Sequence, residues 1–291
     1  MDNVGFIGLG VMGRQMAGNL AKDCVVFGYD VKESRFGGLQ RVARLESIRE
    51  LAEKCSTVCL SLPNADIVEQ VTVGSDGLAD NLSPASLVID FSTTLPSVSR
   101  RVASRLGEKG IEFADAPVSG GEAGARNATL SIMVGSSEKT FERCKPYFSL
   151  VGKSIVRVGD VGAGALSKLV NNMIVGAAFA VIAEGFALAG QNGIDPAILY
   201  NAIRDGWAGS KVLDVSAQAM IAEDYTPGGT INMLEKDLGY ARLVATESHI
   251  PIPITAMAHE VFVAAQATGK GNYSQPAIIA LWRKLTHSKE S

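Results

Sequence analysis

A glycine-rich turn between a short apolar run and a helical segment constrains the fold of this chain more than any other feature. Residues 4–7 predict a β-strand, and the turn follows at once and opens a helix over 11–22. In this context the first glycine permits a tight turn, the second lets the backbone approach a pyrophosphate, and the third allows close helix–strand packing. The helix N-terminus adds N–H groups and partial positive charge. We therefore predict a dinucleotide-binding turn formed by Gly8, Leu9, Gly10, Val11, Met12 and Gly13.

An acidic residue stands where such a turn requires one. Asp30 follows Gly8 by 22 positions, at the end of a second predicted strand, Val25–Tyr29. A carboxylate there accepts hydrogen bonds from the ribose hydroxyls and repels a 2′-phosphate, so the cofactor is predicted to be NAD in preference to NADP. Lys32 and Arg35 lie close by in the sequence and partly offset this preference.

Residues 3–160 alternate between strand-like and helix-like segments. Further strands are expected at 57–62, Leu87–Asp90 and Glu112–Asp115. Between the second and third strands a helix is expected over Ile48–Lys54, with Ser47 as its N-cap and Glu50 completing a capping box. Such alternation is typical of an α/β domain with a doubly wound parallel sheet covered on both faces.

The pattern changes near residue 160, where three glycines mark a turn and strand-like alternation ends. The expected boundary separates a dinucleotide-binding domain, 1–161, from an all-helical substrate and oligomerisation domain, 162–291. The long first helix is assigned to the second domain. Helices are expected at 165–192, 195–204, 213–222, 232–246, 255–268 and 277–285.

Composition excludes several classes of protein. With 291 residues, 47% of them apolar and 20% charged, the chain can form two domains with sizeable cores. Its 27 basic and 30 acidic residues argue against a nucleic-acid partner. The most apolar stretch, 173–183, is shorter than the roughly 20 residues of a membrane span and predicts a buried helix. With no signal peptide recognisable, a cytoplasmic protein without membrane partners is expected.

The cysteines and histidines show no pattern of a metal site. The four cysteines contain no CxxC pair and are expected to be small buried hydrophobes, and the three histidines lack metal-ligand spacing. No GxSxG element of a hydrolase is present. No metal is therefore predicted. The residues concerned are Cys24, Cys55, Cys59, Cys144, His249, His259 and His287.

Four motifs in order along the chain resemble those of the β-hydroxyacid dehydrogenases, a family that includes 3-hydroxyisobutyrate dehydrogenase and tartronate semialdehyde reductase. They are the glycine turn at 5–13, Asp115-Ala-Pro-Val-Ser-Gly-Gly at 115–121, Gly-Ala-Gly-Ala-Leu-Ser-Lys-Leu-Val-Asn-Asn at 162–172, and Lys-Asp-Leu at 236–238. The resemblance implies a Rossmann-type domain, a long interdomain helix and a helical domain of the 6-phosphogluconate dehydrogenase type. It also implies an active site in the cleft between the domains and a homodimer or homotetramer.

The candidate catalytic pair lies near the start of the long helix. Lys168 and Asn172 stand four residues apart and therefore project from one face. Hydride transfer to a carbonyl leaves an alkoxide, which an ammonium group stabilises and protonates. Lys168 is the predicted proton donor, and Asn172 is predicted to hydrogen-bond and position the substrate.

The remaining candidate residues bind the ligands. The backbone and hydroxyl of Ser119-Gly120-Gly121 are suited to a small carboxylate, here that of the substrate. By the resemblance, Ser92 and Thr93 lie near the nicotinamide, Leu62 and Pro63 occupy the equivalent end of an earlier strand, and Lys236 and Asp237 lie near cofactor and substrate.

The function expected is hydride transfer between NAD(H) and a small 3-hydroxy acid or its semialdehyde. Segment 202–214 resembles tartronate semialdehyde reductases, so the favoured pair is tartronate semialdehyde and glycerate, with 3-hydroxyisobutyrate as the alternative. Trp207 departs from the small apolar residue expected in that segment and is either part of the core or a cleft residue. Two further alternatives are an imine reductase, against which the Lys168–Asn172 pair argues, and a non-catalytic dinucleotide-binding protein.

Overall fold

The computed structural model describes residues 2–226 and 228–286, and within them the chain forms two compact units. One unit ends at Lys168 and the other begins at Leu169. The long helix α8, Ala163–Gln191, spans this division, so its first turn belongs to the N-terminal unit.

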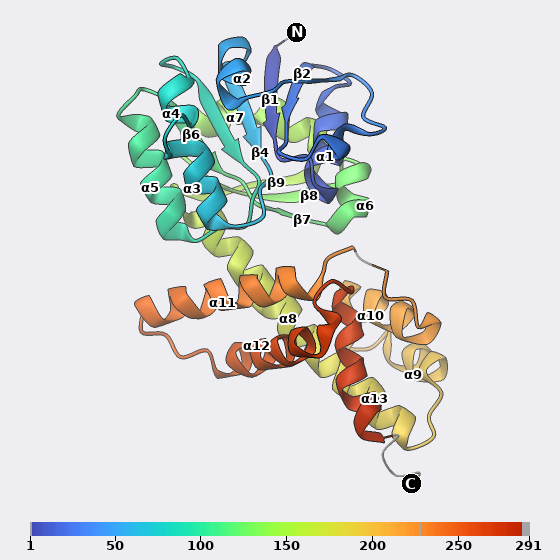
Figure 1. Cartoon of the computed structure of the whole chain (residues 1–291). Helices are drawn as coiled ribbons and strands as arrows, with labels where there is room; N and C mark the ends of the chain where they lie inside the picture. Colours follow the sequence, from blue (N-terminus) through green and yellow to red (C-terminus); the bar gives the residue numbers. More distant parts are fainter. Residues whose placement is uncertain (1, 227, 287–291) are drawn as a thin grey trace. The chain divides into compact units, whose positions relative to one another are not determined.

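The N-terminal unit is built on one twisted sheet (Figure 1). The order of its first six strands is β3-β2-β1-β4-β5-β6, all parallel. From β1 the chain adds β2 and β3 on one side of the sheet and then continues with β4 on the other side, so the strand order reverses between β1 and β4. Open parallel sheets bind ligands at such a point, outside the carboxyl ends of the strands. The strands are β1 (Asn3–Ile7), β2 (Val25–Tyr29), β3 (Val42–Arg44), β4 (Thr57–Leu60), β5 (Leu87–Asp90) and β6 (Glu112–Asp115).

The far end of the sheet departs from the parallel pattern expected from the sequence. β8, Leu130–Gly135, runs antiparallel to both β6 and β7, Val118–Ser119, while β9, Gly152–Gly159, runs parallel to β8. β6 and β8 meet at one pair, Asp115 and Gly135. A short link through β7 and α6 replaces a full helical crossover here, so the chain returns in the opposite direction.

Helices cover both faces of the sheet. On one face α1 packs with α6 and α7, and their apolar side chains join those of the strands in a single core. On the other, α3 contacts both α4 and α5, and α4 contacts α2 (Figure 1). The helices are α1 (Val11–Leu20), α2 (Ile48–Lys54), α3 (Ala65–Val73), α4 (Leu78–Asn81), α5 (Pro96–Gly107), α6 (Gly121–Arg126) and α7 (Glu138–Val151).

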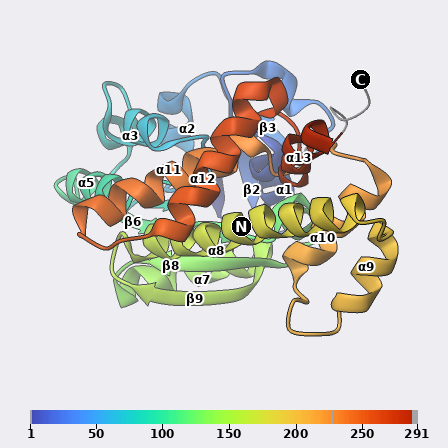
Figure 2. The ribbon, with the colours of Figure 1, turned by 90° about the horizontal axis from the view of Figure 1, so that it is seen from below.

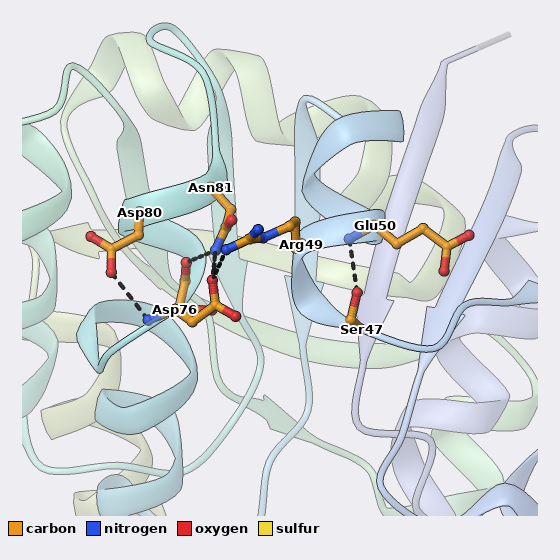
Figure 3. A network of polar contacts seen from close by, with 7 residues as sticks. Ser47, Arg49, Glu50, Asp76, Asp80 and Asn81 are labelled. Atoms are coloured by element: carbon orange, nitrogen blue, oxygen red, sulfur yellow. Dashed lines mark hydrogen bonds and ion pairs between the residues drawn. The ribbon is translucent and has the colours of Figure 1, made fainter.

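The predicted cap of α2 is present in one half only. The Ser47 hydroxyl accepts a hydrogen bond from the Glu50 amide over 3.1 Å, as expected (Figure 3). The Glu50 carboxylate accepts from the amide of Glu46 rather than that of Ser47, so the reciprocal bond is displaced by one residue. Arg49 on the same helix forms an ion pair with Asp76, which ties α2 to the loop before α4 (Figure 3).

In the C-terminal unit the regular secondary structure of the described residues is helical, apart from an isolated bridge between Thr230 and Ser274. Helices α11 and α12 lie side by side (Figures 1 and 2). The predicted helix over 255–268 ends earlier, because a π-helical turn follows at Gln266–Lys270 with Gly269 at positive φ. The elements are α9 (Pro196–Ile203), α10 (Lys211–Ala222), α11 (Ile231–Glu247), α12 (Pro253–Ala265), a 3₁₀ turn (Gln275–Ile279) and α13 (Ala280–Thr286).

Two expectations for this unit are corrected in part. Trp207 was expected either in the core or in the cleft, and its full exposure in the loop between α9 and α10 rules out the core. Helix α8 is buried on one side only: Phe179 and Ala183 are in the core, whereas Ile174 and Val181 are 67% and 62% exposed. By length and apolar composition α8 is also the one described helix able to span a membrane, a test that core helices pass as well.

Candidate active site

The glycine turn after β1 is shaped by contacts that only glycine allows. Gly8 has φ +90°, and a Cβ there would collide with the carbonyl oxygen of Ser61. A Cβ at Gly13 would collide with the carbonyl oxygen of Gly8, which explains the close approach of α1 to the turn. The protein's own packing thus accounts for the first and third glycines.

The second glycine has a different reason. A Cβ at Gly10 would meet no protein atom within 4 Å, so open space lies in front of this backbone. Gly10 caps α1 without a side-chain hydrogen bond, and no acidic residue stands in the first turn. Unsatisfied N–H groups facing open space at a helix N-terminus fit a pyrophosphate, so these residues suit the dinucleotide predicted from the sequence.

Asp30 joins the glycine turn to the end of β2. Its Oδ2 accepts a hydrogen bond from the Leu9 amide over 2.7 Å, and its Oδ1 accepts from the Lys32 amide over 2.8 Å. Each carboxylate oxygen has a second lone pair, so the group remains able to accept ribose hydroxyls. Asp30 therefore orders the turn through its own hydrogen bonds and keeps acceptor capacity for the predicted ribose hydroxyls.

Ser92 braces two of the strand-end loops. Its hydroxyl accepts a hydrogen bond from the Leu62 amide over 2.8 Å, which connects the loops after β4 and β5. Its own amide donates to Asp90 Oδ1 over 2.9 Å. Ser92 is buried, whereas Thr93 is half-buried and Pro63 is exposed. Ser92 and Thr93 are both predicted to lie near the nicotinamide. The Ser92 hydroxyl is already used to connect two loops, and Thr93 is the more accessible of the two.

Ser119, Gly120 and Gly121 connect β7 to α6 in an open turn. Gly120 has φ +138° and Gly121 has φ +62°, and both are exposed, while Ser119 is half-buried. A Cβ at Gly121 would meet nothing within 4 Å. The positive φ values and the open surroundings fit the predicted cradle for a small anion.

Asp115, the last residue of β6, binds the start of α8. Its Oδ1 accepts from the Gly162 amide over 2.8 Å and its Oδ2 accepts from the Ala165 amide over 2.7 Å, all of them buried. Lys168 follows one turn later and is half-buried. The carboxylate of Asp115 is thus connected to the helix segment that carries the predicted proton donor.

Asn172 is held by two hydrogen bonds. Its Nδ2 donates to Asp237 Oδ2 over 2.6 Å, and its Oδ1 accepts from Asn171 Nδ2 over 2.9 Å. Lys236 Nζ lies 3.0 Å from Asp237 Oδ1 and 5.1 Å from the ring centroid of Tyr240. Asp237 is buried, so its carboxylate orients Asn172 and Lys236, whereas sequence reasoning assigned it to the substrate.

The pKa values of two neighbouring carboxyl groups at the strand ends are raised. Burial raises the pKa of Asp90 to about 7, hydrogen bonds from Ser92 oppose the rise, and nearby Asp115 adds to it. Burial raises the pKa of Asp115 to about 6, against the lowering effect of the backbone amides of Gly162 and Ala165. Asp90 and Asp115 are paired across β5 and β6.

Sequence reasoning missed the roles of Asp90, Asp115 and Asn171. Both aspartates end predicted parallel strands that are adjacent in chain order, which is the position from which site residues come in open sheets. The end of a predicted parallel strand is therefore the sequence signal that points to both aspartates. The contact from Asn171 to Asn172 depends on side-chain rotamers and has no sequence signal.

The cysteines and histidines of the described residues form no metal centre. Within 2–226 and 228–286, no group of three or more His, Cys, Asp or Glu side chains is placed to hold a metal ion. Cys55, Cys59 and Cys144 are buried and Cys24 is half-buried. His259 is hydrogen-bonded to Glu235, and His287 lies outside the described residues.

Comparisons with known proteins agree with this architecture. Residues 3–159 match the NAD binding domain of 6-phosphogluconate dehydrogenase, and residues 162–282 match the NAD-binding family of NADP-dependent 3-hydroxyisobutyrate dehydrogenase. A 2-(hydroxymethyl)glutarate dehydrogenase from Eubacterium barkeri is 37% identical over 97% of this chain and 95% of its own length. A 2-hydroxy-3-oxopropionate reductase from Escherichia coli K12 is 34% identical over 98% and 99%.

A solved structure gives the same result for the fold. The crystal structure of a 3-hydroxyisobutyrate dehydrogenase from Salmonella typhimurium superposes with a TM-score of 0.89 at 29% identity, covering 97% of this chain and 100% of that one. The chain belongs to the β-hydroxyacid dehydrogenase family. It is an NAD(P)-dependent oxidoreductase of hydroxy acids, with the predicted Rossmann-type and helical parts.

Proposed function

We propose that the protein reduces tartronate semialdehyde to glycerate and catalyses the reverse reaction, using Lys168 as the proton donor. The observation that carries the catalytic assignment is the pairing of Lys168 and Asn172 one helical turn apart, with the Asn172 amide held by Asp237 over 2.6 Å. A fixed amide beside an ammonium is the arrangement that positions and protonates a carbonyl oxygen. NAD(H) supplies or takes the hydride when bound.

The residues of the chain then have separate tasks. Lys168 stabilises negative charge developing on the substrate oxygen and gives it a proton, and in oxidation its neutral amine takes the proton back. Asn172 retains one N–H and one lone pair beyond its bonds to Asp237 and Asn171, and these hydrogen-bond the substrate. Ser119, Gly120 and Gly121 hold the substrate carboxylate, while the glycine turn and Asp30 hold the dinucleotide.

The charge of the site favours a small monocarboxylate. Lys236 is paired with Asp237 over 3.0 Å, so this lysine brings no uncompensated positive charge for a second carboxylate. The likeness of segment 202–214 to tartronate semialdehyde reductases and the 34% identical Escherichia coli relative support the three-carbon substrate. The 37% identical relative named 2-(hydroxymethyl)glutarate dehydrogenase supports a second candidate, a five-carbon dicarboxylate bearing a hydroxymethyl group.

The test is a substrate panel with purified protein. NADH oxidation is followed with tartronate semialdehyde, methylmalonate semialdehyde and 2-formylglutarate, and NAD reduction with the corresponding alcohols. We expect kcat/KM to be at least tenfold higher for tartronate semialdehyde than for the other two. A higher kcat/KM for 2-formylglutarate identifies the dicarboxylate, and equal values for all three contradict the charge argument.

A variant separates substrate binding from cofactor binding. Ser119→Ala is expected to raise the KM for tartronate semialdehyde at least threefold while the Kd for NADH, from fluorescence titration, stays within twofold. Equal losses for both ligands would contradict the assignment of Ser119 to the substrate carboxylate.

A further inference from the structure

The first turn of α8 has no cap of its own. Gly162, the residue before the helix, has no side chain, and Ala165 in the first turn has no polar group. The first N–H groups of any helix lack acceptors within the helix, and they are ordinarily satisfied by a cap residue and a carboxylate three residues later. Here Asp115, 47 and 50 residues upstream, accepts the Gly162 and Ala165 amides over 2.8 and 2.7 Å.

The same turn lies directly on the strand ends. A Cβ at Gly164 would stand 2.5 Å from the carbonyl oxygens of both Asp115 and Met133. A Cβ at Gly135, on β8, would stand 2.7 Å from the Gly164 amide nitrogen and 2.5 Å from Asp115 Oδ1. Because the two backbones are in direct contact with no side chains between them, the first turn of α8 can occupy only one position on the strand ends. The hydrogen bonds to Asp115 specify that position.

Lys168 follows this anchored turn within the same compact unit. It is three residues after Ala165, and the continuous helix transmits any movement of the first turn to its Cα. A misplacement of about 1 Å in a catalytic group can cost on the order of a hundredfold in rate. A carboxylate that fixes the position of this turn therefore also determines where the Lys168 ammonium lies.

We propose that Asp115 is a positioning residue for Lys168: as a remote cap supplied by β6, it holds the first turn of α8 so that the lysine reaches the substrate oxygen. The proposal rests on the proposed function, in which Lys168 is the proton donor. Asp115 itself touches neither substrate nor cofactor in this scheme. It acts through the helix.

The first experiment is a double-mutant cycle between Asp115→Asn and Lys168→Ala. Asparagine keeps the size of the side chain but places an NH₂ group against one of the two amides, so one capping bond is lost and two donors face each other. We expect Asp115→Asn to lower kcat at least tenfold, with the Kd for NADH within twofold. In the Lys168→Ala background the same change should alter the residual rate less than twofold, because the group being positioned is absent.

A matched control separates positioning from stability. Ser47→Ala removes a side-chain cap from α2, in the same unit but on a helix without candidate site residues. It should lower Tm as Asp115→Asn does, yet leave kcat within twofold. A folded Asp115→Asn protein with unchanged kcat, or an equal loss in both Lys168 backgrounds, would overturn the proposal.

Amide hydrogen exchange tests the cap without any turnover. In the wild type, the Ala165 amide should exchange at least a hundredfold more slowly than in an unstructured peptide, because it is buried and donates its hydrogen bond to Asp115 Oδ2. Exchange within tenfold of the peptide rate overturns the proposal, even if Asp115→Asn fails to fold. A wild type inactive on the whole substrate panel but protected at Ala165 would instead contradict the proposed function and leave the cap in place.

Discussion

The amide nitrogen of Asn172 on α8 donates a hydrogen bond over 2.6 Å to the carboxylate of Asp237 on α11, a residue 65 positions later in the sequence. The Asp237 carboxylate also pairs with Lys236. The buried carboxylate of Asp237 thus orients the Asn172 amide on α8 and balances the positive charge of Lys236 on α11. The sequence predicts Asp237 as a substrate-binding residue, and its contacts with Asn172 and Lys236 add a role in orienting both side chains.

Replacing Asp237 should release Asn172. We expect Asp237→Ala to lower kcat/KM for the substrate about 10- to 100-fold, because losing a buried hydrogen-bond partner costs about 1–3 kcal/mol. Steady-state kinetics measures the loss. Asp214→Ala, which removes a hydrogen bond to Tyr200 in the same unit, is the matched control and should change kcat/KM less than twofold. A similar loss in both variants would indicate a general destabilisation.

Lys168 should carry the proton transfer. Lys168→Ala is expected to lower kcat by about 10²–10⁴-fold or more, because the charge and the proton source disappear together. Lys168→Arg restores the charge but recovers little of the rate, since a guanidinium keeps its proton near neutrality. NADH titration should show unchanged binding for both. A folded Lys168→Ala protein that retains more than about a tenth of wild-type kcat contradicts the assignment and moves the search to Lys236.

Asp30 should determine the choice of cofactor. Asp30→Ala is expected to raise the KM for NADH at least about tenfold, because the ribose contacts are lost and the Leu9 amide loses its acceptor. The same change should improve the ratio of NADPH to NADH activity, because the repulsion of the 2′-phosphate is removed. Asp23→Ala, a change of an exposed acid after α1, should alter neither value. A wild type that prefers NADPH would show that this interpretation of Asp30 is wrong.

Asp90 should make the stability of the protein depend on pH. Its folded pKa of about 7 lies above the value near 3.9 of an unfolded aspartate, so the folded state holds a proton that the unfolded chain has released. The resulting stabilisation is complete below about pH 4 and is lost as the pH rises through 7. Asp90→Asn mimics the protonated form without titrating. The Tm decrease between pH 5 and pH 8 should therefore be smaller in this variant than in the wild type.

The control for Asp90 is Asp66→Asn, which changes an exposed acid in the first turn of α3. Its Tm difference between pH 5 and pH 8 should equal that of the wild type. An Asp90→Asn protein with the full wild-type pH dependence would show that this carboxyl is ionised in the folded state across the range.

The exposed face of α8 should mediate self-association. Ile174, Val181 and Leu188 are spaced by seven residues, lie on one face and are more than 60% exposed. We expect a dimer or tetramer at micromolar concentration, measured by light scattering or sedimentation, and a shift to smaller species in Val181→Gln/Leu188→Gln. Ile198→Gln, at an equally exposed apolar position on α9, should have no effect. A stable wild-type monomer would remove the inference.

Local patterns were sufficient for most elements and for much of the candidate site. The glycine turn predicts its own geometry because the φ of Gly8 and the contact between Gly8 and Gly13 are set within six residues. Lys168 and Asn172 share a helix face because of the helical repeat. The pattern does not predict strands β8 and β9, although both contain β-branched residues, because the short link through β7 and α6 departs from the regular alternation of strands with helices.

The class of fold, the dinucleotide turn, the predicted ribose-binding acid and the spacing of the proposed catalytic pair can all be predicted from the amino-acid sequence, because each depends on residues that are close together in the chain. Which carboxylates hold that pair depends on the tertiary structure. Asp115 reaches Ala165 across 50 residues and Asp237 reaches Asn172 across 65. Such contacts depend on the order of strands in the sheet and on the packing of α11 against α8, and no periodicity encodes either. Trp207 is the converse case, since no local pattern distinguishes a large apolar residue in the core from one exposed on a loop.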